Sequence, residues 1–202
     1  MKITYKLTIT NEDNMTLMSR YPDNYFELAI VDPPYGIGIS KNPVRQKHNK
    51  KSWDSSTPNE KYFEELFRVS KNQIIWGGNY FDLPSTQGFF IWDKKQPHDF
   101  SLAMCEFAWS SIQKPAKMWS LSIHKEQNKI HPTQKPVELY KWILEHNAKD
   151  GDKILDTHLG SGSIALACHD YGFELTACEL DTEYYEKAVE RIKNHVAQQK
   201  LF

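Results

Sequence analysis

Cysteine is scarce in this sequence. Only three of the 202 residues are cysteines, namely Cys105, Cys168 and Cys178. They lie far apart and none belongs to a Cys-x-x-Cys pair, so the sequence indicates neither a disulfide framework nor a zinc site. We expect three buried thiols in a protein of the reducing cytoplasm, with no bound metal.

The sequence also lacks a charge imbalance and any long apolar run. Its formal net charge of -1 argues against a protein that coats nucleic acid through bulk positive charge. Any binding of phosphates must therefore come from a local basic patch. Residues 1–10 alternate apolar and polar side chains and contain no continuous apolar stretch of signal-peptide or membrane-spanning length. We therefore expect a soluble protein with no membrane partner.

No internal repeat or linker interrupts the chain. A length of 202 residues with 40% hydrophobic content suits one well-buried domain, residues 1–202, better than two. Short apolar or alternating runs predict strands at residues 2–8, 27–31, 73–76, 89–92, 106–109, 153–155 and 174–178.

Helical spacing and capping signals predict the helices. Apolar residues at helical spacing indicate helices at 137–148, 164–171 and 183–196. Another follows Thr57-Pro58-Asn59-Glu60, with Thr57 as the cap, Pro58 at the first helical position and Glu60 completing a capping box. Strands and helices alternate at the C-terminal end. This predicts an α/β fold with a doubly wound, mostly parallel sheet and helices on both faces.

A glycine-rich turn lies between a predicted strand and a predicted helix, in the run Asp-Thr-His-Leu-Gly-Ser-Gly-Ser at 156–163. Gly160 and Gly162 allow a ligand to approach the backbone at the start of a helix. Glu179 ends the next strand, where such folds place a carboxylate that binds ribose hydroxyls. Ala165 replaces the third glycine of the dinucleotide fingerprint, which favours an adenosyl ligand without a pyrophosphate. The alternative is a tight turn with no ligand.

A second motif, Asp32-Pro33-Pro34-Tyr35, follows the apolar run at 27–31. The Asp32 carboxylate and the Pro33 carbonyl can accept both hydrogens of an amino group, and successive prolines hold them in place. Tyr35 offers a flat face on which a base flipped out of a duplex can stack. A surface turn is the alternative interpretation of an Asp-Pro-Pro run.

The two motifs, in this order, resemble those of the DNA amino-methyltransferases, in the permuted subgroup whose catalytic motif precedes its cofactor motif. The resemblance implies a Rossmann-like fold that uses S-adenosylmethionine. It implies a catalytic half at about 24–112 and a cofactor half at about 130–196. It also implies catalytic roles for Asp32, Pro33, Pro34 and Tyr35. In that family an aspartate at the first position usually goes with adenine, and a serine with cytosine.

The resemblance extends to His131-Pro132-Thr133-Gln134-Lys135-Pro136, which is similar to the family's segment beside the methionine end of the cofactor. It implies that Lys135 is drawn to the cofactor carboxylate. The full set of cofactor-binding residues that it implies is Asp156, His158, Leu159, Gly160, Ser161, Gly162, Ser163, Glu179, Thr133, Gln134 and Lys135. Thr157 and His158 replace the family's proline and phenylalanine. His158 could cover the cofactor as that phenyl ring does, or be a structural histidine.

A basic segment at 41–53 follows the catalytic motif and contains no acidic residue. Its cations are Lys41, Arg45, Lys47, Lys50 and Lys51. We expect these residues to bind the phosphates of double-stranded DNA, although a solvated loop is the alternative. Only residues 110–129 remain for a region that reads the DNA sequence, which predicts a short recognition site or help from a second subunit in a homodimer.

Two classes of alternative remain open at this point. One is a methyltransferase that acts on another amine, in cytosine, RNA or a protein side chain. The other is a binding module that holds nucleic acid or cofactor without turnover. The adenine interpretation requires that the Asp32 loop and the glycine-rich turn share one cleft.

Overall fold

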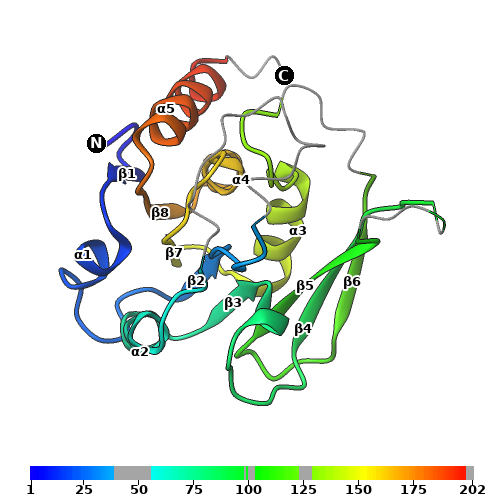
Figure 1. Ribbon diagram of the computed structural model, residues 1–202. Helices are drawn as coiled ribbons and strands as arrows, with labels where there is room; N and C mark the ends of the chain where they lie inside the picture. The colour runs from blue at the N-terminus through cyan, green and yellow to red at the C-terminus, as the bar shows by residue number, and fades with distance from the viewer. Residues whose placement is uncertain (39–55, 98, 100–102, 123–128, 199–202) are drawn as a thin grey trace.

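An eight-stranded sheet organises the computed structural model, which describes residues 1–38, 56–97, 99, 103–122 and 129–198 (Figure 1). Its strand order is β1-β8-β7-β2-β3-β5-β4-β6. The strands are β1 (Leu7–Asn11), β2 (Leu28–Val31), β3 (Gln73–Trp76), β4 (Phe89–Asp93), β5 (Cys105–Ser110), β6 (Lys117–Ser120), β7 (Lys153–Asp156) and β8 (Glu174–Glu179).

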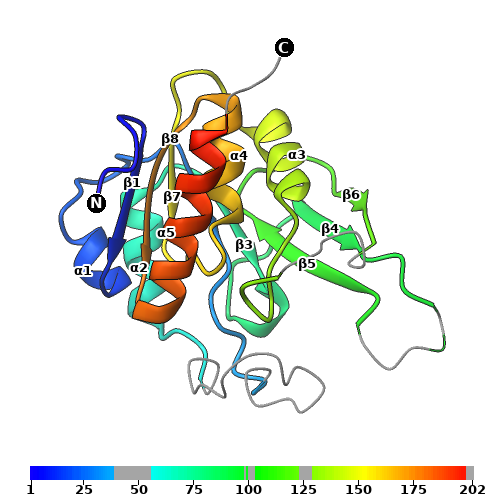
Figure 2. The ribbon, with the colours of Figure 1, turned by 90° about the horizontal axis from the view of Figure 1, so that it is seen from above.

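The sheet is mostly parallel, as the sequence predicts. The strand pairs β1–β8, β8–β7, β7–β2, β2–β3 and β4–β6 are parallel. Strand β5 runs antiparallel to both β3 and β4. Figure 2 shows the strands arranged from β1 on one side of the molecule to β6 on the other. Because β5 is reversed, its first residues lie at the edge where the parallel strands end.

Among the described residues, five α-helices cover the two faces of the sheet. Helices α3 (Val137–Asn147), α4 (Ser163–Tyr171) and α5 (Thr182–Ala197) pack on one face, and α1 (Asn14–Met18) and α2 (Glu60–Val69) pack on the other (Figure 1). Alternation along β2 explains this division, because Leu28 and Ile30 join the first core and Ala29 and Val31 join the second. The doubly wound arrangement with helices on both faces is therefore confirmed.

The N-terminal strand differs from the prediction of residues 2–8. Only Lys2 makes an isolated bridge, to Thr8, and the regular strand begins at Leu7. The Thr4 hydroxyl accepts hydrogen bonds from the backbone N–H groups of Lys6 and Leu7, which favours a local turn over a ladder. The strand then continues to Asn11, so the residues after it lie at the ligand-binding edge.

Two smaller expectations were also wrong. Asn59, and not Thr57, caps α2, because its side chain accepts the N–H of Tyr62 and asparagine caps helices at least as well as threonine. Cys105 is exposed because it begins β5 at the sheet edge, whereas Cys168 and Cys178 are buried as expected. Helix α1 and strand β6 were not predicted, since both are short and lack a clear apolar pattern.

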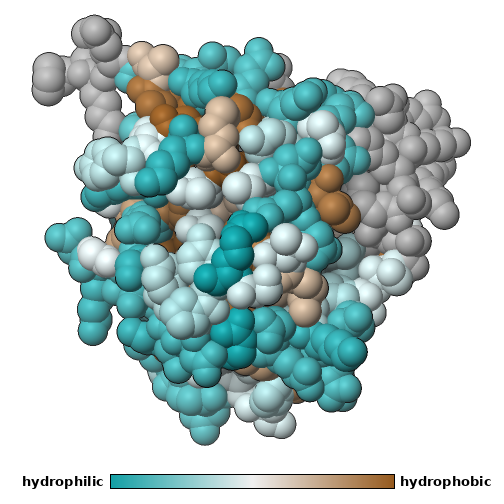
Figure 3. Space-filling view, turned by 90° about the vertical axis from the view of Figure 1, so that its left-hand side faces the viewer, coloured by the Kyte–Doolittle hydropathy of each residue, from teal (hydrophilic) through white to brown (hydrophobic). Residues whose placement is uncertain are grey.

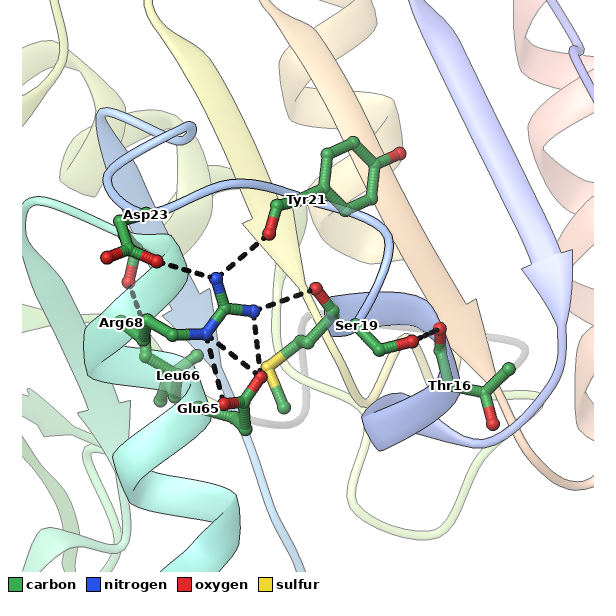
Figure 4. A network of polar contacts seen from close by, with 9 residues as sticks. Thr16, Ser19, Tyr21, Asp23, Glu65, Leu66 and Arg68 are labelled. Carbon is green, nitrogen blue, oxygen red and sulfur yellow. Dashed lines mark hydrogen bonds and ion pairs between the residues drawn. The ribbon is translucent and has the colours of Figure 1, made fainter.

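A polar network fixes the segment that leads into β2 (Figure 4). The Arg68 guanidinium donates to the carbonyl oxygens of Tyr21 and Met18 and pairs with Asp23 and Glu65. These carboxylates raise the pKa of Arg68. Because the pairs are partly exposed, their main effect is to set the path of the loop and not to add much stability.

The surface on the side of β1 and α1 is largely hydrophilic, with apolar residues in small separate patches (Figure 3). Within the described part of the chain, no helix has the length and apolar character needed to cross a membrane.

Candidate active site

A cleft of about 1360 Å³ opens at the edge of the sheet where β2 and β7 end. These two strands are adjacent and parallel, with Leu28 beside Ile154 and Ala29 beside Leu155. The chain leaving β2 and the chain leaving β7 therefore emerge side by side. Asp32 and Pro34 of the first motif and Leu159, Gly160 and Ser161 of the glycine-rich turn line this one cleft.

The Asp32 carboxylate is held through both of its oxygens. Oδ1 accepts a hydrogen bond from the Tyr35 hydroxyl at 2.6 Å, and Oδ2 pairs with the Lys135 ammonium at 2.5 Å. Burial raises the pKa of Asp32 above its usual value, while the positive charge of Lys135 opposes that rise. Both oxygens keep further lone pairs that can accept hydrogens from a substrate in the cleft.

The Tyr35 ring packs against one glycine, Gly77, and a second tyrosine, Tyr80. A Cβ atom on Gly77, which has a φ of +70°, would lie 2.1 Å from Tyr35 Cε1, so only glycine fits there. Tyr80 stacks on the same ring with centroids 4.9 Å apart and an interplanar angle of 12°. It belongs to a short 3-10 helix, Gly78–Tyr80, and is 45% exposed. Tyr35 itself does not line the cleft, but its hydroxyl donates to Asp32, which does.

Lys135 takes a position that differs from the one implied by the family resemblance. Its side chain is 2% exposed, and its ammonium lies between Asp32 and Glu106, 3.0 Å from Glu106 Oε2. Glu106 also pairs with Lys94 at 2.7 Å. The ammonium thus already has two carboxylate partners from the protein itself, so an assignment to a cofactor carboxylate is not what this geometry supports. Lys135 still lines the cleft.

The glycine-rich turn is fixed by backbone contacts. Glu179 accepts the N–H of Gly160 through Oε2 and that of Asp181 through Oε1, both at 2.9 Å. Burial raises the pKa of Glu179, and these N–H groups counteract the rise. Gly162 adopts a left-handed conformation and begins α4 with no side-chain cap. The carboxylate and the turn therefore form one rigid wall of the cleft.

Two more elements brace this wall. Arg191 of α5 donates to the Ser161 carbonyl at 2.9 Å and to the Ser163 hydroxyl at 3.0 Å. The His131 ring contacts Tyr184 of α5 with centroids 4.3 Å apart, and its Nδ1 lies 3.1 Å from the Thr133 hydroxyl. The segment at 131–136 is thereby fixed against the start of α5.

His158 is held by polar neighbours on both ring nitrogens. Its Nε2 lies 3.1 Å from the Asn14 amide and its Nδ1 lies 2.9 Å from the Thr157 hydroxyl. Burial lowers the pKa of His158 to about 4, so the ring is neutral at physiological pH. Tyr62 packs edge-on against it at 5.3 Å. His158 lines the cleft as a fixed, uncharged wall residue.

The predicted site residues divide into three groups. The cleft is lined by Asp32, Pro34, Thr133, Gln134, Lys135, His158, Leu159, Gly160, Ser161 and Glu179. Five further predicted residues lie outside that lining, namely Pro33, Tyr35, Asp156, Gly162 and Ser163. The basic residues Lys41, Arg45, Lys47, Lys50 and Lys51 lie outside the described part of the chain.

Sequence reasoning missed several lining residues. Glu12, Asp13, Asn14 and Met15 line the cleft because β1 ends later than predicted, at Asn11. Tyr62 of α2 also lines the cleft, and its hydroxyl forms a hydrogen bond with the Thr157 hydroxyl at 2.7 Å. Recognising the later end of β1 would have revealed the first group, because residues that follow parallel strands meet at one edge.

Buried charges beside the catalytic motif were missed as well. Lys94 and Glu106 adjoin apolar strands, and a charged residue in such a run needs a partner of opposite sign. That signal indicates an ion pair, although it does not identify the partner.

Comparison with known proteins agrees with the geometry. A family model described as DNA methylase matches residues 92–190. The Type II methyltransferase M.HpaI of Haemophilus parainfluenzae is 33% identical, over 84% of this chain and 69% of that protein. The chain therefore belongs to the DNA methylase family.

Solved structures share the fold at low sequence identity. A complex of M1.HpyAVI with SAM superimposes with a TM-score of 0.63 and 18% identity, over 92% of this chain and 98% of that chain. The cytosine-N4-specific PvuII DNA methyltransferase gives a TM-score of 0.64 and 11% identity, over 96% of this chain and 87% of that chain. The fold is thus shared with an enzyme that methylates cytosine, so fold alone does not identify the target base.

Proposed function

We propose that this DNA methylase transfers the methyl group of S-adenosylmethionine to the exocyclic amino group of adenine in double-stranded DNA. The observation that carries the proposal is that the Asp32 loop and the glycine-rich turn line one cleft. The volume of about 1360 Å³ exceeds that of an ordinary small-ligand pocket and leaves room for a cofactor and a flipped base together.

The glycine side of the cleft fits an adenosyl ligand. Glu179 is fixed by Gly160 and Asp181 and retains lone pairs for ribose hydroxyls, while Gly160 exposes backbone at the mouth of the turn. When bound, the cofactor supplies an electrophilic methyl group. The protein holds the cofactor and excludes water with buried residues such as Leu159 and Tyr184.

The catalytic side fits an amine nucleophile. The lone pair of an exocyclic amine is delocalised into the ring, and acceptors for its hydrogens draw that density back onto nitrogen. Asp32 supplies such an acceptor, fixed by Tyr35 and Lys135. With the cofactor bound, the amine nitrogen would form its bond to the methyl group while the sulfur kept the electron pair of the bond that breaks, and the proton released from nitrogen would pass to solvent. The ionised Asp32 carboxylate is placed to accept hydrogen bonds from the amine as positive charge develops on its nitrogen.

Adenine is favoured over cytosine by the aspartate at position 32, through the family resemblance. The second candidate function is methylation of the cytosine exocyclic amine, which the similarity to the PvuII enzyme favours. The purified protein should transfer a labelled methyl group to unmethylated duplex DNA, and mass spectrometry of the digested product should find N6-methyladenine. N4-methylcytosine alone would establish the second candidate.

Asp32→Ala provides the matched test of the site. We expect methyl transfer to fall by about 10³-fold, because a preorganised group at the reacting atom is lost. Cofactor affinity, measured by calorimetry, should change little, since Glu179 and the glycine-rich turn lie on the other wall. If Asp32→Ala lost cofactor affinity together with methyl transfer, the proposed separation of the catalytic loop from the cofactor-binding wall would be wrong.

DNA contact by the basic segment at 41–53 is part of the same proposal. Replacing Lys47, Lys50 and Lys51 with alanine should weaken DNA binding and reduce its salt dependence, by about one unit of slope per lost phosphate contact. If a second subunit helps to read the sequence, the mass of the protein on DNA should equal that of two chains. A strict monomer on DNA would exclude that assistance.

A further inference from the structure

A chain of four buried or partly buried charges ends at Asp32 of the catalytic loop. It passes from Lys94 to Glu106, then to Lys135 and finally to Asp32, over distances of 2.7, 3.0 and 2.5 Å. The side chains are 11%, 22%, 2% and 18% exposed in that order. Positive and negative charges alternate and balance, which is the arrangement that buried ions require.

Glu106 reaches this position because β5 is reversed in the sheet. Glu106 pairs with Trp92 near the end of β4, and Ala108 pairs with Trp76 at the end of β3. The start of β5 therefore lies beside the carboxyl ends of its neighbours, at the edge that carries the cleft. A glutamate near the start of an antiparallel strand can meet a lysine that follows β4 and another that precedes α3.

The geometry divides the donors of Lys135 between two carboxylates. With Glu106 ionised, Lys135 is pulled toward both Asp32 and Glu106, and Lys94 holds Glu106 from its other side. Burial opposes the charge on Glu106, but the two lysines prevail and lower its pKa to about 2. Glu106 therefore carries its negative charge throughout the physiological range.

We propose that Glu106 is a positioning residue for methyl transfer, acting through Lys135 to orient Asp32 and to keep it a strong hydrogen-bond acceptor. This inference rests on the proposed function of the Asp32 loop. Without the charge of Glu106, the Lys135 ammonium would have Asp32 as its one remaining carboxylate partner among the described residues, so its positive charge would act on Asp32 undivided. Such a carboxylate is a weaker acceptor for the hydrogens of an amine.

The charged and titratable groups around Asp32 set the direction of the expected pH effect. Lys135 and Lys94 provide positive charge, Glu106 and the buried Asp156 provide negative charge, and Tyr35 and Tyr140 are the nearby phenols. The negative charge of Glu106 raises the pKa of Asp32. Its removal should lower that pKa, and the acidic limb of the activity profile should move to lower pH.

The test compares Glu106→Gln with Glu106→Asp in the full chain. Glu106→Gln should lower kcat by about 10- to 100-fold, the equivalent of one to two hydrogen bonds. The KM for DNA and the affinity for S-adenosylmethionine should stay within about twofold. Glu106→Asp keeps the charge and should restore the wild-type acidic limb and part of kcat. Glu174→Gln, at the exposed start of β8, is the matched control and should leave all four quantities unchanged.

A titration of Asp32 by carbon NMR separates this inference from the proposed function. The carboxyl signal of Asp32 should titrate at lower pH in Glu106→Gln than in the wild type, whether or not DNA is the substrate. An unchanged Asp32 titration in a folded Glu106→Gln variant would overturn the positioning role. If the wild-type protein methylates no DNA while Glu106→Gln still shows the shifted Asp32 titration, only the proposed function is refuted.

Discussion

The two walls of the cleft are built in different ways. The glycine wall uses neighbouring segments, residues 156–163 and 179–181, and is joined mainly by backbone N–H groups that donate to carboxylates. The catalytic wall uses side chains from four separate segments, with Asp32, Lys94, Glu106 and Lys135 joined as ions. A wall of local backbone contacts tolerates the loss of a single side chain better than a network of buried charges does.

The largest effect should follow from breaking the charge network at its centre. Lys135→Met removes the only cation that contacts both carboxylates within the described part of the chain, leaving Asp32 with no cation in contact. Breaking a buried ion pair by removing one partner costs about 3–5 kcal/mol, so the free energy of unfolding should fall by that amount. Urea unfolding measures it, and methyl transfer should be lost as well.

Lys141→Met is the control for that variant. Lys141 forms ion pairs with Glu138 and Asp170 at the surface of α3, and its side chain is more exposed than that of Lys135. Its removal should cost about 1 kcal/mol or less. Equal losses for the two variants would contradict the distinction between the catalytic wall and the surface.

A smaller effect is expected from the glycine wall. Glu179→Gln keeps the shape of the side chain, but one backbone N–H, of Gly160 or Asp181, would face an amide nitrogen in place of an acceptor. We expect the dissociation constant for S-adenosylmethionine to rise about 10- to 100-fold, with a smaller change in stability than in Lys135→Met. Calorimetry measures the affinity. Glu190→Gln on the exposed face of α5 should bind like the wild type.

The hydroxyl of Tyr35 tests the catalytic wall without removing a charge. Tyr35→Phe loses the hydrogen bond to Asp32 Oδ1 but keeps the ring that packs against Gly77 and Tyr80. One net hydrogen bond is worth about 1.4 kcal/mol, so kcat should fall about tenfold while cofactor affinity is unchanged. A wild-type kcat would mean that Lys135 alone fixes Asp32.

The same difference between the walls explains what the sequence could predict. The glycine-rich turn and Glu179 are close in sequence and follow predicted strands, so their meeting was predictable from local patterns. The pairing of Lys135 with Asp32 joins residues that are 103 positions apart, and its pairing with Glu106 depends on the reversed strand β5. No periodicity in a strand of six residues reveals its direction in a sheet, so the partner of Lys135 could not be predicted.

The position of β1 shows a related limit. Its end was placed at residue 8 because apolar alternation stops being clear there, whereas the strand reaches Asn11 through pairing with β8. Parallel pairing with a buried neighbour extended the strand beyond its own pattern. Nothing in the sequence pattern therefore indicated that Glu12 and Asp13 line the cleft.

The smallest effect concerns Asp156, the buried last residue of β7. Burial raises its pKa to about 8, with the nearby carboxylates of Asp32 and Glu179 adding to the rise, so it is protonated in the folded protein at neutral pH. In the unfolded chain the Asp156 carboxyl ionises near 3.8, so its contribution to stability is complete below that pH and is lost as pH rises toward 8.

Between pH 6 and pH 7 the wild type should lose about 1 kcal/mol more stability than Asp156→Asn, which mimics the protonated acid. Urea unfolding at both pH values measures the difference. Parallel changes in the two proteins would show that Asp156 is already ionised when folded, and that the fold tolerates a third negative charge near Asp32 and Glu179.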